Sequence, residues 1–356
     1  MLIARTRTVL GRLLTLAALV VLIAPASANA FSKAIWGEVY RGGVNQFPLY
    51  RQLGVTIYEH DLHWGDVAPT RPAHPTNPAD PAYHWPAEVK QALTQAHRFH
   101  MRVLLQIIGA PAWANGGHAS NWAPRRPADF AAFATAAARR YPGVHVWMVW
   151  GEPTRPPNFE PLIPSPPATT LSRAAQAAPH LYARILDAAY GALKRVNPRN
   201  LVIGGCTYTT GSIDTQQWIE NLRLPNGRPP RMDMYAHNPF SYQTPSFTTS
   251  LSPFGEVQFS DLHELTGWVD RYLRRGLPLF LSEWTIPTAP DQEFNFYVDP
   301  SIAAHWITDA LHLSRSWHRI YSLGWVNVYD NPPVSSGGLL TQSGAQKPGF
   351  AAFAHG

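Results

Sequence analysis

The sequence predicts an α/β fold in which eight parallel strands close into a single-domain (β/α)8, or TIM, barrel. Short apolar segments alternate with amphipathic segments from Ala34 to the end of the chain, as in repeated βα units. Two apolar segments, Val144–Pro153 and Pro278–Thr285, each reach a glutamate near their end. Strand-end carboxylates so far apart in the chain share one site when their strands run parallel and end on the same side, as they do in a barrel.

The expected strands are short and rich in β-branched and aromatic residues. Their expected bounds are Ala34–Tyr40, Val55–Tyr58, Arg102–Ile108, Val144–Glu152, Leu201–Thr207, Met232–Ala236, Pro278–Glu283 and Tyr321–Val328. The fourth strand ends at Glu152 because Pro153 cannot donate to a sheet ladder and restricts the residue before it.

Amphipathic segments between these strands predict helices. Their expected bounds are Asn45–Leu53, Ala87–His100, Pro127–Arg140, Ser172–Val196, Asp214–Leu222, Ser260–Arg275 and Pro300–Trp317. A doubly wound open sheet is the alternative, but no glycine-rich phosphate loop follows the first strand. Two smaller domains would also fit the chain length.

The first thirty residues have the pattern of a secretory signal peptide. Arg5, Arg7 and Arg12 precede an apolar run from Leu13 to Ala24, and a small-x-small cleavage site ends at Ala30. We therefore expect a signal peptide at residues 1–30 and a secreted catalytic domain at residues 31–356. The alternative is a retained N-terminal anchor. No later segment is long and apolar enough for stable membrane insertion.

Composition excludes several other classes of protein. The formal net charge of +6 includes three arginines of the signal peptide, and no basic run indicates a nucleic-acid partner. The single cysteine, Cys206, rules out an intrachain disulfide framework and is expected to be a buried thiol. The 34 prolines and 13 tryptophans favour rigid loops and surfaces that stack on sugar rings. Nothing in the sequence fixes an oligomeric state.

The residues around both glutamates resemble those of clan A retaining glycoside hydrolases, especially the β-xylosidase-like and cellulase-like branches. The matching motifs are Trp150-Gly151-Glu152-Pro153 and Ser282-Glu283-Trp284, and the similarity extends over the whole mature chain. The resemblance implies a secreted hydrolase that cleaves O-glycosidic bonds of a polysaccharide, oligosaccharide or glycoside by double displacement. Glu152 would be the acid/base and Glu283 the nucleophile, without a metal or an organic cofactor.

Such a mechanism places specific demands on the two carboxyl groups. Retaining pairs stand about 5–5.5 Å apart, and inverting pairs about 6.5–9.5 Å. Glu283 must be ionised to attack the anomeric carbon, whereas Glu152 must hold a proton at rest and accept one from water later.

Further residues are candidates for contact with the carbohydrate substrate. His237 and Trp325 are similar to the clan's strand-six histidine and strand-eight tryptophan, and Glu38 ends the first strand. The remaining candidates are aromatic residues near strand ends, some of which would instead pack the barrel top: Trp64, Trp113, Trp284 and Tyr242. A polar run from Glu59 to His63 lacks a recognised zinc spacing, so a hydrogen-bonded rim is expected there and no metal site.

Three positions depart from the clan's pattern. Gly151 stands where the clan usually has an asparagine that binds the sugar 2-hydroxyl, and Glu59 replaces the strand-two arginine. The clan's tyrosine that steadies the nucleophile is lost, and Phe240 or Pro239 stands at its position. Tyr235 or Tyr242 would be its substitute. These losses support a second hypothesis, a catalytically impaired carbohydrate-binding protein. A third, a surface-anchored structural protein, depends on an uncleaved signal.

Overall fold

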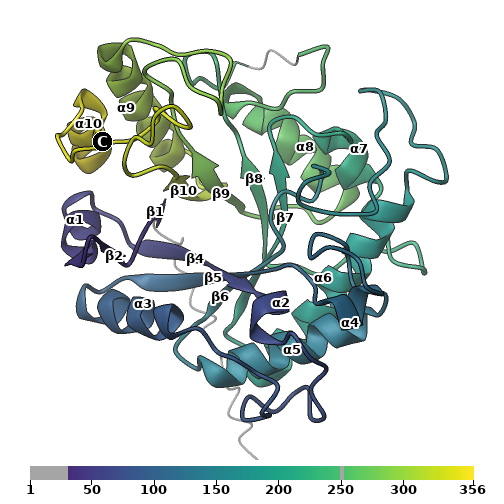
Figure 1. Cartoon of the computed structure of the whole chain (residues 1–356). Coiled ribbons are helices and arrows are strands. Elements are labelled where there is room, and N and C mark those ends of the chain that lie inside the picture. The colour runs from purple at the N-terminus through teal and green to yellow at the C-terminus, as the bar shows by residue number, and fades with distance from the viewer. Residues whose placement is uncertain (1–30, 249–251) are drawn as a thin grey trace, which may run out of the picture.

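The computed structural model describes residues 31–248 and 252–356. The predicted signal peptide, residues 1–30, lies outside the described residues. Eight parallel strands form a closed barrel at the centre of the molecule, with helices packed around it (Figure 1). The order around the barrel is β1-β10-β9-β8-β7-β6-β5-β4, and pairing of β1 with β4 closes it. The predicted (β/α)8 barrel is confirmed.

Each predicted strand is present; β5 has the predicted bounds, and the other strands have shifted ends. The barrel strands are β1 (Ser32–Trp36), β4 (Ile57–His63), β5 (Arg102–Ile108), β6 (Val146–Val149), β7 (Leu201–Tyr208), β8 (Met234–Asn238), β9 (Leu279–Trp284) and β10 (Ile320–Trp325). A small separate hairpin, β2 (Tyr40–Arg41) with β3 (Val44–Asn45), occupies the end of the expected first strand. The expected fourth strand stops at Val149, because Trp150 and Glu152 have φ of 65° and 43°, which an extended strand cannot accommodate.

The helices form the outer layer (Figure 1). They are α1 (Phe47–Gln52), α2 (Trp64–Val67), α3 (Ala87–Arg98), α4 (Ala112–Asn115), α5 (Pro127–Arg140), α6 (Ala177–Val196), α7 (Thr215–Glu220), a 3-10 turn η1 (Phe259–Asp261), α8 (Leu262–Tyr272), α9 (Pro300–Ser316) and α10 (Pro348–His355). Helix α6 begins later than predicted, with Pro179 in its first turn, where proline's missing N–H costs no hydrogen bond. In residues 31–248 and 252–356, none of these helices has both the length and the apolar character to cross a bilayer.

Side chains of each strand alternate between the barrel interior and the layer under the helices. In β8, Met234 and Ala236 belong to the inner apolar cluster, whereas Tyr235 belongs to the outer one. The residue two positions beyond the last inner apolar side chain is polar or amphipathic in five strands. These residues are Trp36, Glu59, Gln106, Asn238 and Ser282. The alternation that builds the inner core therefore brings a ring of hydrogen-bonding groups to the mouth of the barrel.

The last helix is fastened to the first strand by a buried lysine. Lys33 of β1 is 5% exposed, and its Nζ donates to the carbonyl oxygens of Leu53, Phe353 and Ala354. The last carbonyl groups of α10 have no hydrogen-bond partner within the helix, so a cation beside them is favourable. Burial lowers the pKa of Lys33 to about 8. Lys33 therefore joins the first barrel strand, β1, to helix α10.

Gly324 allows β10 to lie against β9 at the mouth of the barrel. A Cβ at this position would lie 1.9 Å from the carbonyl oxygen of Ser282 and 2.6 Å from Oε1 of Glu59. Because the first contact is with backbone, the two strands would have to separate. We predict that Gly324→Ala lowers the free energy of unfolding by about 1–3 kcal/mol or more, measured by urea denaturation.

Gly143→Ala is the matched control for this substitution. Gly143 is exposed, and a Cβ there would meet no heavy atom within 4 Å. The control should change the free energy of unfolding by less than about 0.5 kcal/mol. Equal losses for the two variants would show that contact with Ser282 is not the cause.

Candidate active site

Glu152 lies in the turn after β6, at the rim where the barrel strands end. The residue is 7% exposed, and both of its carboxylate oxygens accept hydrogen bonds. Oε2 accepts from Arg155 at 2.7 Å and from Asn158 at 3.1 Å. Oε1 accepts from Nδ2 of Asn238 at 2.9 Å. Left-handed backbone at a residue other than glycine is uncommon and tends to occur at functional sites, so the turn holds Glu152 in a defined position.

Glu283 reaches the same rim through an irregularity in β9. The pairing of β9 with β10 joins Leu281 to Leu323 and then Trp284 to Trp325, so β9 has one extra residue in this interval. Such a bulge re-aims a side chain out of the regular alternation. Ser282 stays inside the barrel, and Glu283 lies close enough to Glu152 for that carboxylate's charge to act on it.

Asn238 of β8 connects the two glutamates. It is fully buried, and its Nδ2 donates to Glu152 while its Oδ1 accepts the backbone N–H of Glu283 at 3.1 Å. Both ends of the side-chain amide are therefore engaged, one with each glutamate. Asn238 therefore fixes the turn after β6 relative to the end of β9.

The environment of Glu283 disfavours its charged form. Burial, and then the negative charge of Glu152, raise the pKa of Glu283 well above its usual value, with further contributions from Asp61 and Glu293. The positive charge of Arg155 acts in the opposite direction. The arrangement therefore favours the protonated form of Glu283.

Glu59 occupies the inner face of β4 beside this pair. It is fully buried, Oε2 accepts from Ser282 Oγ at 2.7 Å, and Ser282 Oγ in turn accepts from Trp36 Nε1 at 3.2 Å. Oε1 has no hydrogen-bond partner among the described residues. Burial raises the pKa of Glu59 well above its usual value, and the charges of Glu283 and Asp61 add to this effect although the Ser282 hydrogen bond opposes it.

The structure explains why residue 151 is glycine. A Cβ on Gly151 would lie 2.8 Å from Oε1 of Gln106, a buried residue of β5. The Gln106 side chain is held there by a 2.9 Å hydrogen bond from its Nε2 to Asp61. An asparagine at position 151 would need the space that Gln106 fills. The amide group at this part of the barrel mouth thus comes from β5 instead of the residue before Glu152.

Cavities lie on both sides of the glutamate pair. On the side of β1, β4 and β10, a cavity of about 320 Å³ is lined by Glu59, His60 and Asp61, and a neighbouring one of about 510 Å³ by Glu38 and Arg41, among others. On the side of β7 and β8, a cavity of about 540 Å³ is lined mainly by aromatic and acidic side chains. The rim therefore offers space for a ligand beside β4 and beside β7, and neither Glu152 nor Glu283 lines these three cavities.

Three tryptophans expected to contact sugar are buried in the outer core. Trp64 packs against Phe130 and Phe133, and Trp284 packs against Trp325. Trp64, Trp284 and Trp325 are each at most 1% exposed. Trp64 reaches this outer layer from the start of α2, Trp284 follows the extra residue of β9, and Trp325 ends β10. This placement corrects the expectation that they present a stacking surface to a ligand.

His237 is also placed differently from the expectation. It is fully buried, one ring nitrogen lies 2.8 Å from Thr207 Oγ1, and the other lies 2.9 Å from the carbonyl oxygen of Val257. Burial lowers the pKa of His237 to about 4, so the neutral ring is favoured. With both nitrogens engaged in the core, His237 links β7 to the chain before η1 and does not face a ligand.

The remaining candidates lie at the surface. Glu38 forms an exposed ion pair with Arg41 at 3.0 Å. Trp113 of α4 is half-buried, donates to the carbonyl oxygen of Ala68 and lies under the Arg71 guanidinium. Tyr242 is 49% exposed and lines the cavity beside β7 and β8. Of these three residues, Glu38 and Tyr242 border a cavity next to the site.

Among residues 31–248 and 252–356, no group of three or more His, Cys, Asp and Glu side chains is arranged so that it could hold a metal ion. Cys206 is buried in the inner core, and burial raises its pKa well above the usual value, which suits an inert thiol.

Several contacting residues were absent from the expected site. Asn238 could have been found, because two-residue alternation through Met234 and Ala236 leads to it directly. Arg155 and Asn158 follow Glu152 in an irregular turn, and no strand or helix period predicts where such side chains point. Glu293 lies in the long connection after β9, and only the folded loop shows that it approaches the pair.

The fold resembles that of solved glycoside hydrolases. A family 39 glycoside hydrolase from Bacteroides cellulosilyticus WH2 superimposes with a TM-score of 0.63 at 17% identity, over 92% of this chain and 63% of that protein. A monomeric β-xylosidase from Caulobacter crescentus CB15 gives a TM-score of 0.62 at 16% identity, over 91% of this chain and 67% of that protein. No protein-family model and no curated protein sequence matches the chain. The likeness shows a shared fold, and the chain spans about two thirds of the length of these proteins.

The buried carboxyl group of Glu59 should make stability depend on pH. Between the unfolded pKa of about 4.3 and the raised folded pKa, the folded state keeps a proton that the unfolded state releases. The free energy of unfolding therefore falls as pH rises through this range. Glu59→Gln removes that dependence, so its stability relative to wild type should be more favourable at pH 8 than at pH 4, measured by urea denaturation.

Glu88→Gln is the control, since Glu88 is exposed on α3 at the same cavity. Its difference from wild type should be similar at both pH values. If Glu59→Gln also behaves in this way, burial of Glu59 is not a source of pH-dependent stability.

Proposed function

We propose that the chain is a secreted retaining glycoside hydrolase, with Glu283 as nucleophile and Glu152 as acid/base. The observation that carries this proposal is the pair of strand-end glutamates at the barrel mouth, joined through Asn238. Active sites of (β/α)8 enzymes lie at this end of the barrel. The fold shared with glycosidases, among them a β-xylosidase, supports a carbohydrate substrate.

The proposed reaction proceeds in two displacements. A Glu283 oxygen forms a bond to the anomeric carbon while the bond from that carbon to the leaving oxygen breaks, and Glu152 gives its proton to that oxygen. Water then attacks the anomeric carbon of the glycosyl-enzyme and gives a proton to Glu152. The bond to Glu283 breaks, which restores both carboxyl groups and releases the sugar with its original anomeric configuration.

The electrostatics of the pair are relevant to the first displacement. Burial and the charge of Glu152 raise the pKa of Glu283, so a proton on Glu152 would remove one of these causes and favour an ionised nucleophile. A substrate that develops positive charge at the anomeric carbon would stabilise ionised Glu283. Proton transfer to Glu152 and formation of the reactive complex are thus coupled in this mechanism.

A carbohydrate-binding protein on the same barrel is the second candidate function. Arg155 and Asn158 both donate to Oε2 of Glu152, so this oxygen is an acceptor in the structure, whereas an acid must donate a proton from a carboxyl oxygen. A chain in which Arg155 never leaves Glu152 would bind sugars without cleaving them.

Secretion can be tested on the protein recovered from culture medium. We expect intact-mass spectrometry to give a mature chain that begins at Phe31, after cleavage at the small-x-small site. A chain that retains residue 1 and stays with the membrane fraction would favour the surface-anchored alternative.

Turnover on aryl β-glycosides, beginning with the β-xyloside, tests the proposed reaction. Glu283→Ala should abolish activity because no nucleophile remains. Glu152→Ala should lower turnover by about 10²–10⁴-fold on substrates with poor leaving groups but much less on activated aryl glycosides, which need little protonation. The control is Glu264→Ala, at an exposed position of α8, and it should retain wild-type rates.

The outcome separates the two candidate functions. If wild type is inert on a broad panel of glycosides but binds soluble polysaccharides in calorimetry, the hydrolase proposal fails. The binding-protein proposal then takes its place. Activity that survives in Glu283→Ala would reject the assigned nucleophile.

A further inference from the structure

Aromatic side chains line the cavity on the β7 and β8 side of the glutamate pair. We call them the aromatic platform: Tyr208, Phe240, Tyr242, Phe294 and Phe296. Their rings form a continuous series, with centroid distances of 5.3 Å from Tyr208 to Phe240, 5.3 Å from Phe240 to Phe294, 5.8 Å from Phe294 to Phe296 and 6.2 Å from Phe296 to Tyr242. Tyr242 is 49% exposed, and Phe294 and Phe296 are half-buried, so aromatic surface remains open to a ligand.

The same cavity has a polar edge. Glu256, Gln292, Glu293 and Asn295 line it together with the platform. A sugar ring has an apolar face of C–H groups and an edge of hydroxyl groups, so it matches aromatic rings beside carboxylate and amide groups. A purely apolar ligand would cover this polar edge without offering it hydrogen bonds.

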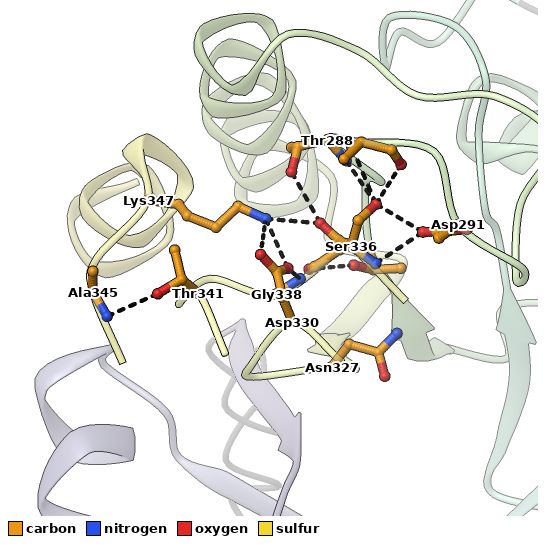
Figure 2. A network of polar contacts seen from close by, with 12 residues as sticks. Thr288, Asp291, Asn327, Asp330, Ser336, Gly338, Thr341, Ala345 and Lys347 are labelled. Atoms are coloured by element: carbon orange, nitrogen blue, oxygen red, sulfur yellow. Dashed lines mark hydrogen bonds and ion pairs between the residues drawn. The ribbon is translucent and has the colours of Figure 1, made fainter. Parts of the chain in front are cut away.

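The loop that supplies Phe294 and Phe296 is fixed in place by Asp291. Oδ1 of Asp291 accepts the backbone N–H groups of Glu293 and Phe294 at 3.1 and 2.9 Å. Oδ2 accepts the backbone N–H and the hydroxyl of Ser336 at 2.8 and 2.7 Å (Figure 2). The loop after β9 is therefore tied to the loop after β10.

A partly buried ion pair anchors Ser336 in turn. Nζ of Lys347 donates to both carboxylate oxygens of Asp330 and to the carbonyl oxygen of Ser336, at distances of 2.7–3.0 Å (Figure 2). Thr288 adds a 2.9 Å hydrogen bond to the same carbonyl oxygen. A platform held by such a network is organised before a ligand arrives, which lowers the entropic cost of binding.

Contacts of Glu152 determine which part of a substrate this platform faces. Arg155, which donates to Glu152, lies over the Tyr208 ring with its guanidinium carbon 4.4 Å from the ring centroid. The acid of a retaining glycosidase stands beside the oxygen that leaves. The platform adjoins Glu152 through Arg155 and Tyr208, whereas Glu59 and its cavity adjoin Glu283 through Ser282.

We infer that the aromatic platform binds the leaving-group saccharide, the sugar that is released with the protonated oxygen. This inference rests on the proposed hydrolase function and adds its preferred substrate class, an oligosaccharide or polysaccharide with sugar on the leaving side. A simple glycoside with a small leaving group leaves the platform unused.

Two substrates of the same sugar distinguish the platform from the rest of the site. The first substrate is a trisaccharide of that sugar, which places sugar on the platform. The second is the glycosyl fluoride, which has the same transferred sugar and a single atom as leaving group. The pair is chosen for the sugar that the aryl glycoside panel identifies. Phe294→Ala and Phe296→Ala should each lower kcat/KM for the trisaccharide by about 3- to 10-fold and leave kcat/KM for the fluoride within about twofold of wild type.

Tyr297→Ala is the matched control, because Tyr297 is an aromatic residue of the same loop that is 57% exposed and does not line the cavity. It should leave both substrates unaffected. Equal losses on both substrates in the Phe294 and Phe296 variants, or no loss on the trisaccharide, would overturn the inference while leaving the hydrolase function intact. Absence of turnover on every sugar of the panel would reject both proposals.

Discussion

The constraint on which the site depends is the two-residue alternation of side chains in a closed parallel barrel. Inward positions of β4, β5, β8 and β9 are apolar in the core and become Glu59, Gln106, Asn238 and Ser282 at the mouth. Closure forces these positions to face one another, because all strands end on the same rim. The contacts Ser282–Glu59 and Asn238–Glu152 follow from that geometry.

The two glutamates themselves lie where this regularity is broken. Glu152 follows a strand that stops at Val149, in a turn with left-handed backbone, and Glu283 follows an extra residue in β9. Regular continuation of β9 would place residue 283 on the outer face, since Ser282 is inward. A bulge in one strand and a turn in the other bring both carboxyl groups to the rim, and Asn238 fixes their relation.

These breaks explain what the sequence could and could not predict. Alternating apolar segments were sufficient for the barrel, and glutamates at matching strand ends were sufficient to select Glu152 and Glu283. Similarity to a family pattern selects His237, whereas the alternation through Ala236 assigns Asn238 to the inner face. Arg155 and Glu293 lie in irregular loops whose path depends on tertiary contacts, so no local period indicates them.

The distribution of charge links the two sides of the site. In place of an arginine, β4 supplies Glu59, whose buried carboxyl group favours its neutral form beside Glu283. Positive charge instead comes from Arg155, in the turn after β6, which contacts both Glu152 and the face of Tyr208. A ligand that covers Tyr208 must share that ring with Arg155. Ligand binding at the aromatic platform and the hydrogen bonding of Glu152 therefore involve the same side chain, that of Arg155.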